Sequence, residues 1–483
     1  MASRSSRTNT SATLSAAKNS RERGNFGQEI VTTALGDVIQ TRKEAFVFDQ
    51  QVPSVSGAMT WRRPSGDVLN LNANLEYFEE DLREKTRNRP TNTLPASQRV
   101  FRRGEDSISS ELGGDYETGL GKGRLELIAL RRDAHSPFTQ SVADYNETGP
   151  ANRALVRFEQ TVDTSETIAR AEYSISVRDG HDWQVAGETA LNTLDATSAL
   201  FGLGPGGALE PLPIGSPRAE VEERRIDLAL PHGRRLTSGL TVQASLGGEV
   251  SEIEAGDGRS DSFSRPKGFV AASYVIRDGY TVNARLAREV GQLDFFDFVS
   301  SVDLGQVTAD RGNSGIVPQQ SWLGEMTVER TFGDFGAGTL RLYAEDIEDI
   351  VDRVPLANGS EGPGNIDSAR RWGGELTGTL KLDPFGLTGA QILLEAEANS
   401  SRLDDPLTGE TRRISDDLVS EVIVEARRDF PGTPWAVLLG YEQNREARDY
   451  RINETSFRPR IAGRSYVMVE HKDLWGMTGS IRV

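Results

Sequence analysis

Apolar and polar residues alternate along many segments of this chain. Between residues 68 and 77 the odd positions carry Leu, Leu, Ala, Leu and Tyr, and the even positions carry Val, three Asn and Glu. The same period of two returns at 169–178 and at 390–398. Successive side chains of a strand point to opposite faces, so each segment has one apolar and one polar face. A membrane-spanning β-barrel accommodates all such faces at once, because lipid surrounds it and its lumen is polar. The pattern therefore predicts an all-β fold, an antiparallel transmembrane β-barrel.

Turns rich in Gly, Pro and Asp separate strands that the pattern groups in pairs. The predicted pairs are 5–17 with 25–33 (turned at 19–24), 45–61 with 67–80, 105–118 with 123–132, 153–178 with 182–193, 220–230 with 238–252 (turned at 231–233), 268–277 with 280–290, 321–332 with 338–350, 370–382 with 389–400, 416–429 with 435–445, and 462–472 with 476–483.

Long polar connections separate the pairs, at 82–104, 133–152, 194–219, 253–267, 291–320, 351–369, 401–415 and 446–461. Outer-membrane barrels have short periplasmic turns and long extracellular loops, so this alternation also predicts the orientation of the chain.

About twenty strands result from this division, with 153–178 taken as one long strand that bulges near Thr164. The first predicted strand then runs downward and the last runs upward. A complete barrel starts upward and ends downward, so we expect twenty-two strands with one missing at each end. Residues 1–483 form one domain in this interpretation, a partial barrel.

Composition limits the alternatives. Only 36% of the residues are hydrophobic, and no run of about 18 apolar residues exists, so the sequence predicts no transmembrane helix. The net charge of -17 argues against nucleic acid as a partner, and the absence of Cys fits an oxidising compartment. Residues 1–7 carry positive charge with no apolar stretch behind them, which predicts no signal peptide. Because an outer-membrane protein must be exported, we expect a fragment.

Tryptophans fall mostly at predicted strand ends beside turns, at Trp61, Trp183, Trp322, Trp372, Trp435 and Trp475. Trp favours the membrane interface because it is part apolar and part polar, so we interpret these residues as interfacial belts. The alternative is that they cap a soluble core.

Motifs that carry chemistry are absent or weak. The string Gly202-Leu203-Gly204-Pro205-Gly206-Gly207 matches a dinucleotide fingerprint, but its prolines favour a flexible loop. The pairs 404–405 and 416–417 are acidic without EF-hand spacing, which favours solvated surface acids. His181, His232 and His471 fall at or beside predicted short turns. The sequence thus predicts no catalytic, metal or cofactor-binding residues, and no enzyme.

Charged residues on the polar faces should line the lumen, because an Arg in mid-bilayer costs ~2–4 kcal/mol. This set comprises Arg124, Glu126, Arg170, Glu172, Arg178, Arg285, Glu325, Glu329, Arg341, Glu345, Arg371, Glu375, Lys381, Glu395, Glu397, Glu421, Glu425 and Arg427. Pairing across strands, contact with a plug and plain solvation of the wall are all compatible with it. Phe295, Phe296, Phe298 and Trp322 are possible ligand contacts by their position in a predicted loop, although the ligand-binding residues stay unassigned.

Residues 365–376, Asn-Ile-Asp-Ser-Ala-Arg-Arg-Trp-Gly-Gly-Glu-Leu, resemble the entry into a strand of TonB-dependent outer-membrane receptors. That family tends to have Asn, Ala, Gly and Glu-Leu at these positions after a long loop. Residues 341–350 resemble the preceding strand, with Tyr343 and the family's I-x-D-x-I pattern. The resemblance covers nearly the whole chain as barrel. The family's plug domain, its short TonB-contacting box and its closing aromatic strand have no counterpart in this sequence.

The resemblance implies a monomeric barrel in a Gram-negative outer membrane. It implies import of a scarce nutrient, such as a siderophore-iron complex, a vitamin or a glycan. It also implies outer-membrane lipid and, through a plug, a TonB-type energy-transducing complex as partners, with no cofactor. Two alternatives stay open from the sequence: a plugless porin or structural barrel, and a soluble all-β protein. The absence of a fixed internal repeat counts against a repeat protein.

Overall fold

The computed structural model is almost entirely antiparallel β-sheet, with three short 3-10 helices among the residues it describes. It describes residues 9–33, 36–92, 95–146, 153–304, 308–356, 359–452, 455–456, 463–474 and 477–482. No helix in these segments is long and apolar enough to cross a membrane. The strands of the main sheet are β1 Asn9–Thr32, β2 Val38–Arg62, β3 Val68–Pro90, β4 Ser97–Leu120, β5 Gly123–Asn146, β6 Arg153–Arg178, β7 His181–Leu203, β8 Leu209–Leu212, β9 Arg218–Arg235, β10 Leu240–Ala255, β11 Ser260–Arg277, β12 Tyr280–Val290, β15 Gln320–Thr331, β16 Gly336–Pro355, β17 Glu361–Lys381, β18 Ala390–Asp404, β19 Thr411–Arg412, β20 Leu418–Asp429, β21 Trp435–Glu446, β24 Arg464–Leu474 and β25 Met477–Arg482.

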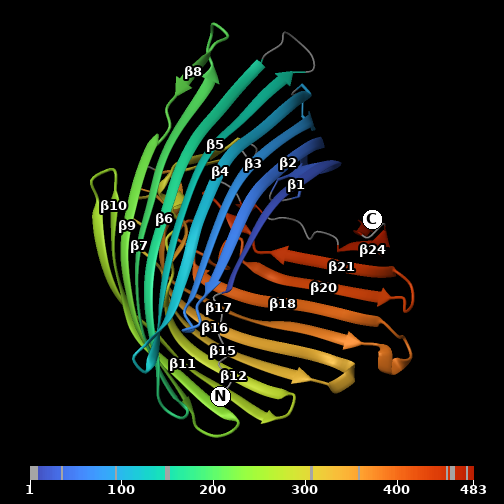
Figure 1. Ribbon diagram of the computed structural model, residues 1–483. Helices are drawn as coiled ribbons and strands as arrows, with labels where there is room; N and C mark the ends of the chain where they lie inside the picture. The colour runs from blue at the N-terminus through green and yellow to red at the C-terminus, as the bar shows by residue number, and fades with distance from the viewer. Residues whose placement is uncertain are drawn as a thin grey trace.

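These strands form one 21-stranded sheet that curves around a lumen (Figure 1). Each long strand pairs with the next one along the chain, and β8 and β19 only extend the ends of β7 and β18. Two small hairpins lie outside this sheet, β13 (Ser301–Asp303) with β14 (Thr308–Asp310) and β22 (Asp449–Tyr450) with β23 (Thr455–Ser456). Within the described residues no pairing joins β1 to β25. The predicted antiparallel barrel-type sheet of about twenty strands is confirmed.

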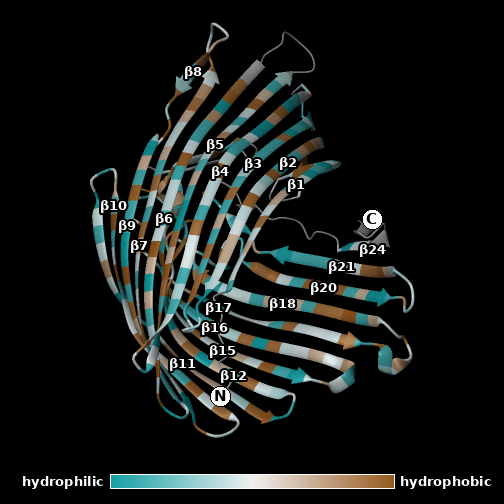
Figure 2. Ribbon diagram, in the orientation of Figure 1, coloured by the Kyte–Doolittle hydropathy of each residue, from teal (hydrophilic) through white to brown (hydrophobic). Residues whose placement is uncertain are grey.

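Hydrophobic and hydrophilic residues alternate along the strands (Figure 2), and on a strand this alternation places them on opposite faces of the sheet. On β10, Leu246 and Val250 are 77% and 57% exposed, whereas the intervening Glu249 is 6% exposed. On the neighbouring β9, Leu228 is 63% exposed and Arg225 is 6% exposed. The outer face therefore carries exposed apolar residues and the inner face carries covered charges, as expected for a barrel in lipid.

The first predicted hairpin is wrong. Residues 9–32 form one 24-residue strand, and the predicted turn at 19–24 lies inside it, paired regularly with residues 47–52 of β2. The polar run there indicated a turn, but pairing with β2 outweighs local preference. The first strand thus starts at the end of the sheet that holds the short turns, opposite to the predicted direction.

Most of the predicted long loops are also wrong, because the strands continue into them. β3 and β4 include most of 82–104, and β5 and β6 leave only 147–152 of the predicted loop at 133–152. The longest connection is 291–319, which includes the 3-10 helix η1 (Phe295–Phe298) and the small hairpin β13–β14. Beyond the apolar band both strand faces are polar, so the period of two disappears from the sequence although the ladder continues.

Two local predictions need smaller corrections. Residues 231–233 lie within β9 and pair with β10, and the turn follows at 236–239. β6 is indeed one strand of 26 residues, but Thr164 pairs without irregularity. The shift in register lies instead between Ser176 and Arg178, next to the turn.

Candidate functional site

A network of ion pairs covers the inner face of the sheet. Arg341 on β16 is paired with Glu325 on β15 and with Glu375 on β17, and Glu325 also pairs with Arg285 on β12 at 3.3 Å. Arg371 binds Glu345 at 2.7 Å across β17 and β16. These residues, all predicted to line the lumen, thus hold one another across adjacent strands.

The network continues on the other side of β12. Arg225 on β9 contacts Glu188 on β7 at 3.0 Å and Asp227 at 2.9 Å. Lys267 on β11 links Asp227 to Glu249, the latter at 2.8 Å. These charges, together with Arg170 on β6, line a cavity of about 460 Å³ on the lumen side. Cations and anions alternate along it, so the wall is polar without a single dominant sign.

Residues 291–304 and 308–319 fold inward over this wall. Phe298 and Val299 are each 5% exposed and pack in a cluster with Val162 of β6 and Leu194 of β7. Phe295 packs against the same cluster, whereas Phe296 is 53% exposed. Phe298 and Phe295 therefore hold the segment on the wall, which leaves Phe296 as the aromatic side chain available to a ligand. We call residues 291–319 the inward loop.

Asn365 on β17 fixes the far end of the inward loop. Its Oδ1 accepts a hydrogen bond from the Val317 amide at 2.8 Å, and its Nδ2 donates to the Val317 carbonyl at 2.8 Å. The same Nδ2 donates to the Asp349 carbonyl at 2.7 Å. Asp349 has a positive φ of 56° and lies at an irregularity of the β16–β17 ladder, which leaves its carbonyl free for this bond. Asn can do this because its side chain carries both a donor and an acceptor.

Other strands hold the rest of the loop. On β5, Gln140 accepts a hydrogen bond from the Leu304 amide at 2.9 Å. On β6, Gln160 donates to the Ser300 carbonyl at 3.3 Å. Arg265 of β11 donates to the Pro318 carbonyl. The inward loop is thus held by side chains from β5, β6, β11 and β17, which lie on different sides of the lumen in Figure 1.

A cavity of about 640 Å³ lies between the inward loop and the loops that follow β16, β18 and β21. Asp294, Phe296 and Asp297 of the inward loop line it, and so do Asp352 and Arg353 from β16. Burial, and to a lesser degree the neighbouring Asp294, raise the pKa of Asp297 to about 6. The cavity offers polar groups of both kinds beside an exposed aromatic ring, as small-molecule sites commonly do.

One buried cluster stiffens the loops around this cavity. Arg412 has a side chain 2% exposed and binds Asp352 and Asp405, both at 3.1 Å. Its guanidinium also lies 4.8 Å from the ring centroid of Tyr450. Burial raises the pKa of Asp405, but hydrogen bonds from Thr408 and Arg412 outweigh it and hold this pKa below its ordinary value. The cluster therefore ties three loops together through one cation.

Two predictions for the acidic pairs fail at this cluster. Asp405 has a fully buried side chain, and Asp417 accepts a hydrogen bond from Ser401 at 2.6 Å with its side chain 6% exposed. Asp404 and Asp416 are exposed surface acids, as expected of both pairs. The sequence could not reveal this, because Arg412 and Ser401 become partners only when the loop closes.

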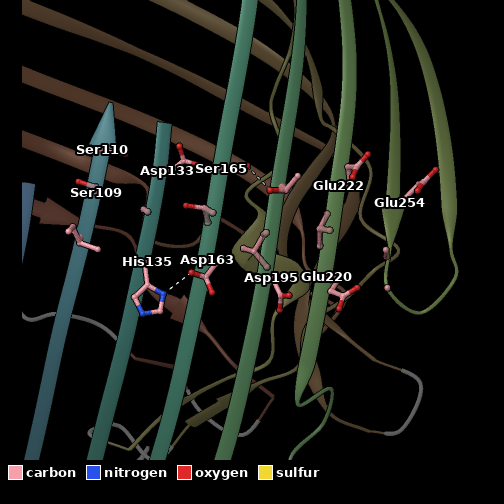
Figure 3. A pocket seen from close by; sticks show the side chains of 18 of the residues that line it. Ser109, Ser110, Asp133, His135, Asp163, Ser165, Asp195, Glu220, Glu222 and Glu254 are labelled. Carbon is pink, nitrogen blue, oxygen red and sulfur yellow. Dashed lines mark hydrogen bonds and ion pairs between the residues drawn. The ribbon is translucent and has the colours of Figure 1, made fainter. Parts of the chain in front are cut away.

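On the outer face, a polar hollow marks where the apolar band ends (Figure 3). His135 of β5 lies 2.7 Å from Asp163 of β6, and both point outward, away from the ion-pair network. Asp195 of β7 and Glu220 of β9 continue the same row. Within the described residues no group of three or more His, Asp or Glu side chains could hold a metal ion. The hollow is therefore best interpreted as a solvated border above the lipid-facing band.

The tryptophans lie at both borders of that band. Trp183 and Trp435 are outward-facing and stand near the short turns, where they contact the rings of His232 and His471 at 4.2 and 4.5 Å between centroids. Trp322 and Trp372 stand on the opposite border, outward-facing and 50% and 47% exposed. Trp322 lies on the outer face of β15 rather than in a loop, and its role as a ligand contact stays a prediction. Trp475 lies outside the described residues.

Several residues of the motif at 365–376 have structural roles that the sequence alone did not indicate. Asn365 clamps the inward loop, and Ala369 is 2% exposed in a core cluster with Ile347 and Ile350. A Cβ on Gly373 would lie 2.7 Å from the Tyr343 hydroxyl. Sequence reasoning identified these positions as a resemblance and assigned none of them a role.

Comparison with known proteins supports the fold. No family model matches the chain, and no curated protein matches it. Among solved structures, FpvA of P. aeruginosa, in complex with iron and a heterologous pyoverdine, aligns with a TM-score of 0.61 at 12% identity over 98% of this chain. The copper transporter OprC aligns at 0.57 with 11% identity, covering 97% of this chain and 73% of its own. The siderophore receptor PiuA from Acinetobacter baumannii aligns at 0.55 with 9% identity, covering 98% and 76%.

This chain spans 66% of the length of FpvA. At such identities the likeness bears on the fold alone. The chain has the barrel fold of TonB-dependent receptors, and the predicted fold resemblance is confirmed.

Proposed function

We propose, from the premise that the sheet has the barrel fold of TonB-dependent receptors, that this chain is the barrel of an outer-membrane receptor that binds and imports a scarce nutrient. The observation that carries the proposal is the inward loop. It is clamped by Asn365 and lines a polar cavity of about 640 Å³ at the end of the lumen opposite the short turns.

The contacts support capture rather than free diffusion. The inward loop is held by hydrogen bonds to four strands, so it occupies part of the lumen. A fixed loop lowers the entropy lost when a ligand binds. Phe296, Asp294 and Asp297 would then contact the ligand, and the Arg412 cluster would hold the opposite wall of the site in place.

The class of nutrient stays open in this proposal among siderophore-iron complexes, vitamins and glycans. A ligand of that size matches the cavity only in part, so the exposed loop ends would complete the site. We further propose that the barrel is monomeric and works together with a plug and a TonB-type energy-transducing complex.

Uptake tests this proposal directly. Cells that carry the protein in its natural full length should take up one labelled class among ferric siderophores, cobalamin and oligosaccharides, and a protonophore should abolish the uptake. An Asn365→Ala variant should lose binding of that ligand by roughly tenfold, because releasing two to three hydrogen bonds costs about 1–3 kcal/mol in a buried setting. The matched control is Asn283→Ala on β12, which removes an amide that donates to Glu329 of β15 beside a short turn, at the end of the lumen opposite the inward loop.

Two results would contradict the proposal. Absence of the protein from the outer-membrane fraction would remove its basis. Uptake of many small sugars without an energy source would instead identify a porin, the second function compatible with a polar wall.

A further inference from the structure

Lys and Arg recur at the short turns of the sheet, where acidic residues such as Asp67, Asp278 and Asp383 also lie. Every short turn between neighbouring long strands has Lys or Arg within about two residues. The set comprises Arg62, Arg63, Lys122, Arg178, Arg234, Arg235, Arg277, Arg330, Lys381, Arg427, Arg428 and Lys472. Arg178, Lys381 and Arg427 of this set face the lumen, whereas Arg63, Arg234, Arg330 and Arg428 lie on the outer face at this end, which we call the short-turn rim.

Cations on the short-turn rim stand against aromatic rings. The guanidinium carbon of Arg63 lies 4.4 Å from the ring centroid of Trp61. The guanidinium carbon of Arg330 lies 4.9 Å from the ring centroid of Phe332, and that of Arg428 lies 5.3 Å from the ring centroid of Phe430. The strand pattern places all three pairs on the lipid-facing side, since Met326 and Trp322 share the outward face of β15 with Arg330.

Histidines repeat the arrangement. His232 stacks on Trp183, and His181 lies 5.7 Å from His232 between ring centroids. Arg234 follows His232 on the same face of β9 and pairs in register with His181. At this part of the rim, two imidazole rings and one guanidinium group therefore lie around one exposed Trp.

Arg427 and Lys472 of the set are paired with Asp429, but three outward-facing arginines of the rim are not paired with a carboxylate of the described residues. Among the described residues, Arg234, Arg330 and Arg428 have no carboxylate oxygen within 4.0 Å. Arg63 has one, Asp67 at 3.9 Å, but hydrogen bonds from Thr118 and Ser65 also occupy that carboxylate.

The opposite border of the apolar band behaves differently. Arg218 is paired with Asp195 at 3.5 Å and with Glu220 at 2.6 Å, and Arg224 with Glu222 at 2.5 Å. Arg370 is paired with Asp346 at 3.4 Å. These three outward-facing cations are thus paired within the protein, whereas Arg234, Arg330 and Arg428 on the short-turn rim are not.

We propose that the short-turn rim binds the phosphate groups of anionic phospholipids in the adjacent leaflet. An aromatic ring places its apolar body among acyl chains at this depth, and an Arg laid on the ring keeps its N–H donors at the level of the headgroups. A guanidinium binds phosphate oxygens through two parallel hydrogen bonds, which suits it to this partner. The inference rests on the proposed function in one respect only, because it requires the barrel to lie in a bilayer.

Lipid retention tests this inference. The purified chain is reconstituted into nanodiscs of equimolar phosphatidylcholine and phosphatidylglycerol, and the lipids that stay bound after detergent extraction are counted by native mass spectrometry. We expect phosphatidylglycerol to be enriched several-fold over its bulk share. The variant Arg234→Gln/Arg330→Gln/Arg428→Gln should return the bound lipids to the bulk ratio.

A matched control removes the same charge from the other border. The variant Arg218→Gln/Arg224→Gln/Arg370→Gln should keep the enrichment, because its cations are already paired. Equal enrichment in both triple variants, or none in the unaltered protein, would overturn the inference. Displacement of the lipid by inorganic phosphate would also overturn it, in favour of a free-anion site. Failure of the chain to enter bilayers at all would refute the proposed function instead, and protease protection in the nanodiscs reports that step separately.

Discussion

Leu246→Arg is the substitution that most directly tests whether the outer face of the sheet meets lipid. Leu246 is 77% exposed and stands near the middle of β10 (Leu240–Ala255), halfway between the short-turn rim and the acidic border at Glu254. Its neighbour Gln243 points to the lumen on the same strand. Gln243→Arg is therefore a control that introduces the same side chain on the opposite face.

The expected magnitudes separate the two environments. In lipid, an Arg at mid-depth on the outer face costs ~2–4 kcal/mol, which lowers the folding equilibrium constant roughly 30- to 700-fold. In water, exchanging an exposed Leu for Arg changes stability by no more than about 0.5 kcal/mol. The Gln243→Arg variant should stay within that smaller range in either environment, because the lumen wall is already charged and solvated.

Guanidinium titration of the protein folded into phosphatidylcholine vesicles measures both variants, with tryptophan fluorescence as the signal. We expect Leu246→Arg to lower the free energy of unfolding by ~2–4 kcal/mol at an unchanged slope, and Gln243→Arg to leave it nearly unaltered. A loss below about 0.5 kcal/mol for Leu246→Arg would refute the assignment of this face to lipid. Equal losses in both variants would refute the division into inner and outer faces.

Three further predictions concern the loops. Arg412→Gln leaves two carboxylates buried without their cation and should cost ~3–5 kcal/mol, seen as faster proteolysis of the loops at that end, whereas Arg370→Gln on the exposed outer face should change little. Asp297 has its pKa raised from 3.8 to about 6, so the folded state binds more protons and its stability falls as pH rises through that interval. Asp297→Asn should therefore raise the melting temperature at pH above 6 and lose this advantage toward ~pH 4, and a constant difference across pH would contradict the assignment. A Cβ on Gly312 would collide with the Phe298 carbonyl, so Gly312→Ala should displace the inward loop and speed hydrogen exchange at Val299. Gly206→Ala, in the loop after β7 with no atom within 4 Å of its Cβ, tests for a general loop effect.

The period of two was sufficient to predict the fold because lipid imposes the same requirement on every strand. Leu228 and Leu246 alternate with Asp227 and Glu249 for that reason, and no knowledge of neighbouring strands is needed to recognise the pattern. Beyond the lipid band this requirement ends. Residues 83–89 form strand with polar side chains on both faces, so their sequence looked like loop.

The candidate site was largely invisible for a related reason. Phe298 packs against Val162 and Leu194, more than a hundred residues earlier in the chain, and nothing local to residues 291–319 indicates an inward path. The sequence indicated Asn365 only through the resemblance of residues 365–376 to a strand of TonB-dependent receptors. Its role depends on a carbonyl released by the irregular backbone at Asp349, and neither that irregularity nor the distant Val317 can be read from the motif.

The ion pairs across the inner wall have a consequence for assembly. Arg285 lies directly opposite Glu325, Arg341 opposite Glu375, and Arg371 opposite Glu345 in the strand ladders. A slip of one residue would turn these charges into the bilayer, and a slip of two would separate the partners while keeping the faces correct. The second error is the one that hydrophobicity cannot detect. The ion pairs therefore disfavour that second error, because each strand that joins the sheet in the wrong register leaves its charges without their partners. The correct register is the one in which all these pairs form.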